Sequence, residues 1–396
     1  MSDRPVIVEA VRTPIGRFQG GLAEVPAPRL GAACVQGLLA RTGLEPELLD
    51  EVIMGCVAQA GLGQNPARQA AIHGGVPPAV SAMTINKVCG SGLRSVTLAA
   101  QAIRAGDACC VVAGGMENMS RIPYALLAAR DGLRLGHGQV TDLLVHDGLW
   151  DVYNDYHMGN TAELVASKYG VSREDQDEFA VESHRRAVAA QAAGAFAREI
   201  VPVSVAQHKG EPRVVSADEG PRADASREAL ARLKPAFQRD GGSVTAGNAS
   251  TINDGAAALL VCGESFARAH GLKARAAIDG YATGGVEPQW VMMAPVRAVR
   301  SLLARTERAL ADYGLVELNE AFAAQAVAVV RELGLDPARV NVRGGAIALG
   351  HPIGASGARI LVTLLHAMED LDVERGLAAL CLGGGDAVAV SLRRLP

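Results

Sequence analysis

Aromatic residues are scarce in this chain of 396 residues, where Phe, Trp and Tyr together make up 4%. Basic runs are missing as well, and the formal net charge is -4. Without a basic patch, the chain lacks the electrostatic footprint of a protein that binds nucleic acid or an anionic membrane, which excludes both as expected partners. Intrinsic disorder is excluded too, because it combines low hydrophobicity with high net charge, whereas 49% of these residues are hydrophobic.

Cysteine lacks the spacing that a disulfide scaffold or a structural zinc site requires. The chain has seven cysteines, an odd number, and contains neither a C-x-x-C pair nor an H-x-x-E-H sequence. A small disulfide-rich domain would show an even count, and a zinc site would show paired ligands at short spacing. We therefore expect a protein of a reducing compartment that needs no metal.

Long apolar runs are also missing. The most apolar windows, 255–263 and 376–390, are interrupted by Gly or by Asp386 and stay below the ~18 residues of a membrane span. The first residues show no charged and then apolar stretch of a signal peptide, and the last residues do not form a peroxisomal Ser-Lys-Leu address. These observations predict a cytoplasmic protein that does not enter a membrane.

Glycine, by contrast, is abundant. It accounts for 45 of the 396 residues, about 11% against a usual ~7%, which predicts many tight turns or close backbone approaches. Short apolar runs such as 51–54 and 109–113 have the length of buried strands, and they alternate with stretches of helical period. The clearest expected helix covers 93–105 and stops at Gly106. This alternation is typical of the α/β class.

Two stretches of the chain resemble each other. A Ser-Gly pair, a helix and a strand that ends in glycines occur at 91–115 and again at 356–384. Such an echo indicates a duplicated α/β half. Between the halves, most of the Tyr and Trp residues and a long polar stretch gather, which indicates an inserted, more exposed subdomain placed to cover a ligand. The expected parts are an N-terminal half of 1–120 completed by about 250–270, an insert of 121–249 and a C-terminal half of 271–396.

Cys89 is the first candidate for chemistry. It lies between a strand-like segment and the N-terminus of the expected helix 93–105. The partial positive charge and free N–H groups of a helix N-terminus lower the pKa of a thiol and favour the nucleophilic thiolate. The alternative is a small buried cysteine. That alternative is what we expect for the remaining cysteines of apolar or helical segments, Cys34, Cys56, Cys109, Cys110 and Cys262.

Three further residues are candidates because of their local context. His351 lies in a glycine-rich loop at 344–357 that lacks the P-loop and Rossmann spacings, so it is either a general base for a distant cysteine or the cap of a turn. Cys381 precedes three glycines whose N–H groups could form an oxyanion hole, or it is simply a strand-end cysteine. Asn319 opens an expected helix at 321–333, where an N-cap alone would explain it.

Seven segments together resemble the thiolase family across nearly the whole chain. In order they are Arg12-Thr13-Pro14-Ile15-Gly16, Cys89-Gly90-Ser91-Gly92, Gly114-Gly115-Met116-Glu117-Asn118-Met119-Ser120, Gly247-Asn248-Ala249-Ser250, Asn319-Glu320-Ala321-Phe322-Ala323, Gly350-His351-Pro352 and Cys381-Leu382-Gly383-Gly384-Gly385. One of them would be a weak match, whereas all of them in family order are specific. Asp147-Gly148-Leu149-Trp150 and the following His157-Met158-Gly159 are similar to the acetyl-CoA acetyltransferase branch, which makes acetoacetyl-CoA.

The resemblance implies a fold, an assembly and a reaction. The fold would be a five-layer αβαβα core of two similar halves, with the insert as a loop domain over coenzyme A. The assembly would be a homotetramer, a dimer of dimers. The protein would take part in fatty acid metabolism. The reaction would be the reversible Claisen condensation of two acetyl-CoA molecules to acetoacetyl-CoA and coenzyme A. Coenzyme A thioesters would be the substrates, with no cofactor bound permanently.

The resemblance also implies roles for the candidate residues. Cys89 would attack the thioester carbonyl and become acetylated, while His351 takes its proton. Cys381 would remove the α-proton of a second acetyl-CoA. His351 and a water held by Asn319 would stabilise the enolate oxygen, and the N–H groups of Cys89 and Gly383 would stabilise the tetrahedral intermediate. The pantetheine arm would run past Leu149, His157, Met158, Ala246, Ser250 and Phe322, and Arg222 would lie near the adenine nucleotide.

Three positions depart from the family pattern. Arg343 stands where Asn is common, Thr251 where Gly is usual, and Asp386 where Met or Gln is frequent. These departures concern substrate preference and rate more than reaction type. Three alternatives stay open. The nearest is a 3-ketoacyl-CoA thiolase of broader chain length. A carrier-protein-dependent condensing enzyme is opposed by Cys381 and Asn319-Glu320, and a non-catalytic acyl-CoA-binding paralogue is suggested only by Asp386 and Arg343.

Overall fold

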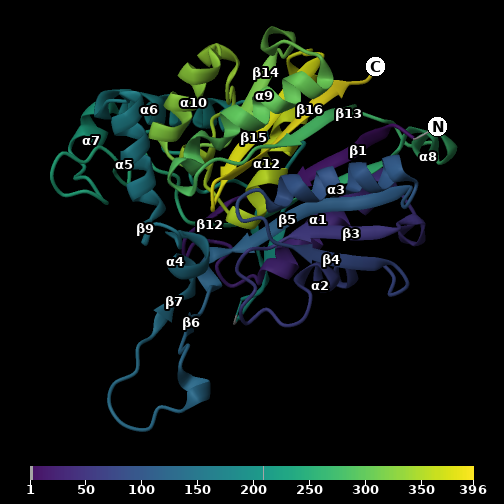
Figure 1. Cartoon of the computed structure of the whole chain (residues 1–396). Coiled ribbons are helices and arrows are strands. Elements are labelled where there is room, and N and C mark those ends of the chain that lie inside the picture. Colours follow the sequence, from purple (N-terminus) through teal and green to yellow (C-terminus); the bar gives the residue numbers. More distant parts are fainter. Residues whose placement is uncertain (1–2, 208) are drawn as a thin grey trace.

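A computed structural model describes residues 3–207 and 209–396 as a mixed α/β fold (Figure 1). Ten strands form the central sheet in the order β14-β15-β16-β13-β1-β12-β5-β3-β4, with β2 beside β12. These strands are β1 (Pro5–Arg12), β2 (Gly16–Arg17), β3 (Glu51–Gly55), β4 (Ser81–Ile85), β5 (Cys110–Asn118), β12 (Asn253–Gly263), β13 (Ala276–Thr283), β14 (Leu315–Leu318), β15 (Arg375–Leu382) and β16 (Asp386–Arg394).

The sheet repeats one pattern twice. In the N-terminal half, β12 runs antiparallel between β1 and β5, and β3 is parallel to β5. In the C-terminal half, β16 runs antiparallel between β13 and β15, and β14 is parallel to β15. The two patterns meet where β1 pairs with β13, at Val6 opposite Ala277. The repetition confirms the duplicated halves predicted from the internal echo, and it joins them in one continuous sheet.

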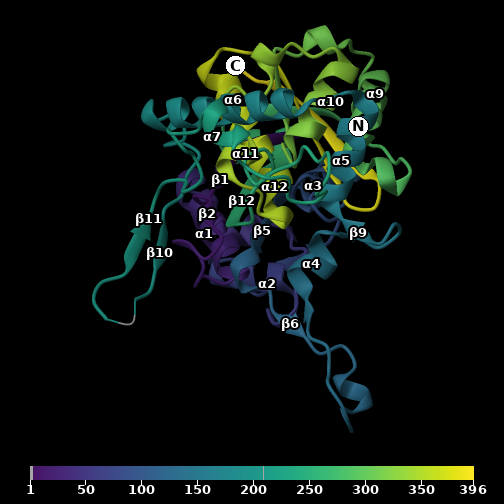
Figure 2. The same cartoon turned by 90° about the vertical axis from the view of Figure 1, so that its left-hand side faces the viewer.

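Helices complete a stack of five layers (Figures 1 and 2). One buried cluster packs α1 (Ala27–Thr42) and α2 (Pro66–His73) on the outer face of the N-terminal half. A second cluster places α3 (Ser91–Ala105) and α12 (Ile353–Asp370) between the two halves. A third packs α9 (Ala294–Thr306) and α10 (Ala323–Leu333) on the outer face of the C-terminal half. The order αβαβα is therefore confirmed.

The middle layer forms because its helices are apolar at helical spacing. In α3, Leu93, Val96, Ala100 and Ile103 recur on one face and are all buried. The helix ends at Gly106, as predicted, because this residue adopts φ 84° and donates its N–H to the carbonyls of the last turn. α12 is buried over nearly its whole length, which is what a helix covered by sheet on both sides requires.

The insert between β5 and β12 adds helices and three small hairpins. Its elements are β6 (Tyr124–Ala125), β7 (Thr141–Asp142), α4 (Leu143–Gly148), β8 (Trp150–Asp151), β9 (Tyr156–His157), α5 (Met158–Tyr169), α6 (Arg173–Ala192), β10 (Val203–Val205), β11 (Arg213–Val215) and α7 (Arg227–Ala231). The hairpins β6–β7 and β10–β11 extend away from the body (Figure 2). Fully buried Arg12 ties the insert to β1, because its Nε donates to Glu199 at 2.6 Å and its Nη1 to Asp218 at 2.6 Å.

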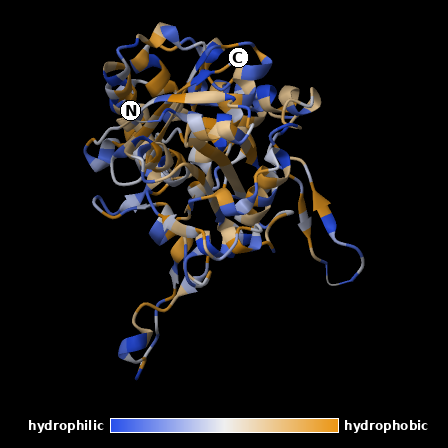
Figure 3. Ribbon diagram, turned by 90° about the vertical axis from the view of Figure 1, so that its right-hand side faces the viewer, coloured by the Kyte–Doolittle hydropathy of each residue, from blue (hydrophilic) through white to orange (hydrophobic). Residues whose placement is uncertain are grey.

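Apolar residues gather along the central strands, and polar residues lie mainly on the outside (Figure 3). Across residues 3–207 and 209–396, no helix combines the length and the apolar character needed to cross a bilayer. Cys34, Cys56, Cys110 and Cys262 are buried as expected, whereas Cys109 is exposed. The prediction for Cys109 was wrong because it precedes β5, where the chain enters from a solvent-facing turn.

Candidate active site

Cys89 lies in a tight loop between β4 and α3. Ser91 closes this loop, because its hydroxyl donates to the carbonyl of Val88 at 2.6 Å and accepts from the N–H of Lys87 at 2.8 Å. Burial raises the pKa of the Cys89 thiol to about 12, although the N–H groups of Cys89 itself and of Gly383 face the sulfur and lower it. The expectation of a lowered pKa was therefore wrong, because desolvation outweighs the helix N-terminus.

His351 lies on the loop that leads into α12. Its backbone N–H donates to Asn253 Oδ1 at 3.0 Å, and its Nδ1 lies 2.6 Å from Ser356 Oγ. Gly350 adopts φ 107°, and a Cβ there would lie 2.3 Å from the Asn253 side chain. Burial, assisted by the charge of Arg359, lowers the pKa of the imidazole to about 4. His351 is therefore neutral at neutral pH, as a proton acceptor must be.

Cys381 is the penultimate residue of β15 and is buried. Burial raises the pKa of its thiol, and the nearby Cys89 thiol raises it further. The following residues, Gly384 and Gly385, adopt φ 88° and 91°, so glycine is needed to turn the chain back into β16. The turn also brings the Gly383 N–H to the sulfur of Cys89. Two thiols and two N–H donors thus meet at one point.

One cavity of about 250 Å³ brings most of the predicted site residues together. Its wall includes Cys89, His351, Cys381 and Gly383, together with Leu149, His157, Met158, Ser250 and Phe322. A neighbouring cavity of about 160 Å³ is lined by Arg222 and Ala246, and Thr251 belongs to both. The predicted residues therefore follow one route from the thiols to Arg222. Such a route suits a long, mostly apolar ligand with a polar end.

Asn319 is close to the site but does not line either cavity. It follows β14, is fully buried, and neither atom of its side-chain amide has a partner. Its predicted role as an N-cap was wrong, because α10 begins at Ala323 and is preceded by Phe322 with an extended backbone. The chain from Asn319 onward is instead held by Asn248, whose carbonyl accepts from the Ala323 N–H at 2.8 Å.

Several residues around the site were not predicted from the sequence. Asn253 holds the His351 loop from a strand 98 residues away, so no local pattern could reveal it. Phe237 stacks on His157 with ring centroids 4.8 Å apart, again from a distant segment. Glu117 accepts hydrogen bonds from Val57 and Gly354, each at 3.0 Å, and so joins both halves. Glu117 lies in one of the segments that resemble the family, and this was the available sequence signal. Burial raises the pKa of its carboxyl to about 7.

The three departures lie in different places. Thr251 donates to Asn253 Oδ1 at 2.7 Å and so supports the histidine loop. Arg343 pairs with Asp370, away from the cavity of the two thiols. Asp386 pairs with Lys87, two residues before Cys89. In the part of the chain that the structure describes, no group of three or more His, Cys, Asp or Glu residues has a metal-binding arrangement.

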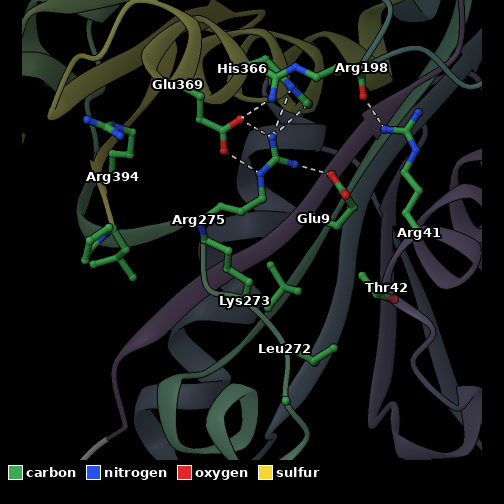
Figure 4. Close-up of a pocket in the computed structure, with 14 residues that line it drawn as sticks. Glu9, Arg41, Thr42, Arg198, Leu272, Lys273, Arg275, His366, Glu369 and Arg394 are labelled. Atoms are coloured by element: carbon green, nitrogen blue, oxygen red, sulfur yellow. Dashed lines mark hydrogen bonds and ion pairs between the residues drawn. The ribbon is translucent and has the colours of Figure 1, made fainter.

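A larger cavity of about 690 Å³ lies elsewhere and contains none of the predicted residues (Figure 4). Its arginines are already engaged. Arg275 donates to both oxygens of Glu369, at 2.7 and 2.8 Å, and also pairs with Glu9. Arg41 donates to the carbonyl of Ile200 at 3.0 Å. This cavity is therefore not the site of the predicted chemistry.

Family comparisons agree with this geometry. The thiolase N-terminal domain matches residues 5–265, and the thiolase C-terminal domain matches residues 272–394. The chain belongs to the thiolase family. This thiolase is 58% identical, over 98% of its length and 99% of the relative, to a protein of Pseudomonas aeruginosa named acetyl-CoA acetyltransferase.

Two further relatives support the assignment. A protein of Staphylococcus aureus named probable acetyl-CoA acyltransferase is 56% identical over 98% of both chains. The crystal structure of the Bacillus anthracis acetyl-CoA acetyltransferase superposes with a TM-score of 0.97 at 44% identity, covering 100% of this thiolase and 99% of that chain. The thiolase fold expected from the sequence is thereby confirmed.

Proposed function

We propose that this thiolase is an acetyl-CoA C-acetyltransferase, which reversibly condenses two acetyl-CoA molecules to acetoacetyl-CoA and coenzyme A. One observation carries the proposal: Cys89, His351 and Cys381 line a single cavity in which the N–H groups of Cys89 and Gly383 face one sulfur. A nucleophile, a neutral base and two N–H donors are the parts that acyl transfer through a cysteine requires, and the second thiol can serve as the base for the condensation.

The first half-reaction uses Cys89 and His351. The thiol gives its proton to the neutral imidazole while the sulfur attacks the thioester carbonyl. The oxygen that becomes negative is met by the N–H groups of Cys89 and Gly383, which are worth ~3–4 kcal/mol each in comparable sites. The carbon–sulfur bond to coenzyme A then breaks, and the leaving thiolate takes the proton back from His351. The products are acetyl-Cys89 and free coenzyme A.

The second half-reaction uses Cys381. Its raised pKa makes its thiolate a strong base for the α-proton of a second acetyl-CoA. The resulting enolate attacks the carbonyl of acetyl-Cys89, a carbon–carbon bond forms and the carbon–sulfur bond to Cys89 breaks. The Cys89 thiolate then takes the proton that Cys381 removed, which restores the Cys381 thiolate. His351 and a water held by the unpaired amide of Asn319 would face the enolate oxygen, since that buried amide has no protein partner.

Coenzyme A would lie along the two neighbouring cavities. The apolar wall from Leu149 to Phe322 suits the pantetheine arm, and Arg222 in the second cavity suits the nucleotide. The departures from the family pattern remove none of the reacting groups, which favours an enzyme over a non-catalytic paralogue. We further propose the parts 1–120 with 250–270, 121–249 and 271–396, supported by family matches that divide between 265 and 272.

The proposed assembly is a homotetramer. Two surfaces support it. β4 is the outermost strand of the sheet, with Met83 39% exposed, and an uncovered edge strand invites pairing with another copy. The β6–β7 hairpin exposes four leucines, Leu126, Leu127, Leu133 and Leu135, far from the body. Light scattering coupled to size exclusion should give four times the mass of 41.0 kDa, and a monomer would contradict the proposal.

Cytoplasmic location and a role in fatty acid metabolism complete the proposal. The cysteines support the location, because all seven are unpaired in the described structure, as in a reducing compartment. Mass spectrometry after brief exposure to acetyl-CoA should find one acetyl group on Cys89, and an active enzyme with label elsewhere would contradict the mechanism. Thiolysis of 3-ketoacyl-CoA substrates of increasing length should be fastest with acetoacetyl-CoA; equal rates with long chains would favour the broader thiolase instead.

A further inference from the structure

Two loops from different halves of the protein pack face to face beside Cys89. One is 86–90, before α3, and the other is 382–386, between β15 and β16. A Cβ on Gly90 would lie 2.3 Å from Leu382 Cδ2, and a Cβ on Gly383 would lie 3.4 Å from Val88 Cγ1. The two loops are therefore in direct contact, and a Cβ on Gly90 would push the end of the Leu382 side chain aside.

This packing decides the geometry of the two N–H donors. Cys89 and Gly383 each contribute one N–H to the same sulfur, yet they stand on different loops. Their spacing is not fixed by one turn of backbone, as it would be within a single loop. It depends on how the two loops dock, and donors must lie within a few tenths of an ångström of their ideal place to stabilise developing charge.

An ion pair crosses between the two loops. Lys87 Nζ pairs with Asp386 Oδ2, and the other oxygen of Asp386 accepts from the Ala387 N–H at 2.7 Å. Lys87 stands two residues before Cys89, and Asp386 stands three residues after Gly383. Among the ion pairs formed by residues 3–207 and 209–396, this one alone joins 86–90 to 382–386. The side chains are 27% and 31% exposed, so water screens the attraction only in part.

The loop that carries Cys89 also needs restraint. Val88 adopts φ 46°, a conformation that is strained for a β-branched residue. Asn86 Oδ1 accepts from its N–H at 2.9 Å, and Ser91 donates to its carbonyl at 2.6 Å. Such strain persists only where the surroundings over-determine the backbone. The ion pair between Lys87 and Asp386 restrains this loop from the C-terminal half of the molecule.

We propose that Lys87 and Asp386 are positioning residues, an ionic clamp across the two halves that sets the spacing of the Cys89 and Gly383 N–H donors. The proposal rests on the proposed function, because those donors act on the tetrahedral intermediate of acyl transfer.

Thiolysis kinetics of four variants test the clamp. Asp386→Asn and Lys87→Gln should each lower kcat for acetoacetyl-CoA about ten-fold, less than the loss of a whole donor, with KM changed less than about two-fold. The double variant should be no slower than either single one, since the same interaction is lost. Lys87→Asp combined with Asp386→Lys should recover at least a third of the lost rate. Glu332→Gln, which breaks the exposed pair with Arg300, is the matched control and should leave kcat unchanged.

Salt dependence gives a second readout that a merely structural role would not move. Raising NaCl from 0.05 to 0.5 M should lower the wild-type kcat about three-fold at saturating substrate, and it should leave the kcat of Asp386→Asn nearly constant. A wild-type rate in Asp386→Asn would overturn the clamp while leaving the proposed function intact. A loss of kcat in Lys87→Gln but not in Asp386→Asn would also overturn the clamp, because the lysine charge would then act without its partner. A wild-type protein that does not thiolyse acetoacetyl-CoA would contradict the proposed function itself.

Discussion

His351 Nδ1 lies 2.6 Å from Ser356 Oγ, and the same hydroxyl lies 2.9 Å from the carbonyl of Pro352. A serine hydroxyl has one proton, which Ser356 donates to Pro352 in this arrangement. Ser356 then accepts a hydrogen bond from Nδ1–H, so the lone pair of the neutral imidazole is on Nε2. This partner, only five residues along the chain, thereby leaves Nε2 as the proton acceptor, which the proposed role of His351 requires.

Replacing Ser356 by alanine should therefore slow acyl transfer while leaving the protein folded. We expect kcat for acetoacetyl-CoA thiolysis to fall about ten-fold, because His351 remains but its ring is no longer held in one tautomer. Ser95→Ala is the matched control, since this buried serine lies in α3 and its hydroxyl lies 2.8 Å from the carbonyls of both Gly92 and Gly114, away from His351. An equal loss in both variants would show a packing effect and contradict the role of Ser356.

His351 should also make stability depend on pH. Its pKa is about 4 in the folded protein and near 6.5 when unfolded, so between these values only the unfolded chain binds the proton. The contribution is fully present above pH 6.5 and is lost as pH falls toward 4. At pH 5 the loss is about 2 kcal/mol. Urea unfolding at pH 7.5 and 5.0 should show this extra loss in the wild type and not in His351→Asn.

The same urea comparison has a simple background control. His73→Asn, at an exposed histidine, should lose as much stability between the two pH values as the wild type does. Indistinguishable pH dependence in the wild type and in His351→Asn would contradict a neutral buried imidazole.

The architecture was predictable because its signals are local. Buried strands such as β3 and β5 appear as short apolar runs, and α3 shows its apolar face and its stop at Gly106 within 16 residues of sequence. The echo between halves needed only short matching strings. The thiols and the histidine could be found because each lies within two residues of a glycine, a residue favoured where loops pack closely.

The predictions that were wrong concern residues whose environment is set by contacts far apart in the sequence. Asn319 was assigned to a helix start, but the carbonyl of Asn248 captures the Ala323 N–H and delays α10. The pKa of Cys89 was expected to fall, but burial by residues of both halves raises it. The link from Asn253 to His351 spans 98 positions, which no periodicity can show. Local pattern therefore located candidate residues that share one cavity, and only the fold revealed their environment.

The close packing between the N-terminal and C-terminal halves can be tested at Gly115. A Cβ there would lie 2.0 Å from the carbonyl oxygen of Gly354, at the start of the helix that follows His351. Neither atom belongs to a flexible side chain, so Gly115→Ala should destabilise the protein by more than about 3 kcal/mol and lower its melting temperature by several degrees. Gly285→Ala is the control, because its Cβ would be 3.8 Å from the nearest atom, and it should melt within about 1 °C of the wild type. Similar melting of both variants would contradict the close approach.

Cys381→Ser separates the two half-reactions. The serine hydroxyl is far less acidic than a thiol, so it cannot act as the base for the α-proton, whereas Cys89 and His351 keep their places in the cavity. The variant should still accept one acetyl group on Cys89 from acetyl-CoA, seen by mass spectrometry within about three-fold of the wild-type rate. Condensation to acetoacetyl-CoA should fall by at least about a hundred-fold, the lower range for loss of an acid–base group. Cys34→Ser, at a buried cysteine outside the cavity, is the control and should condense normally. Full condensation by Cys381→Ser would assign the base to another group, with His351 the first to test.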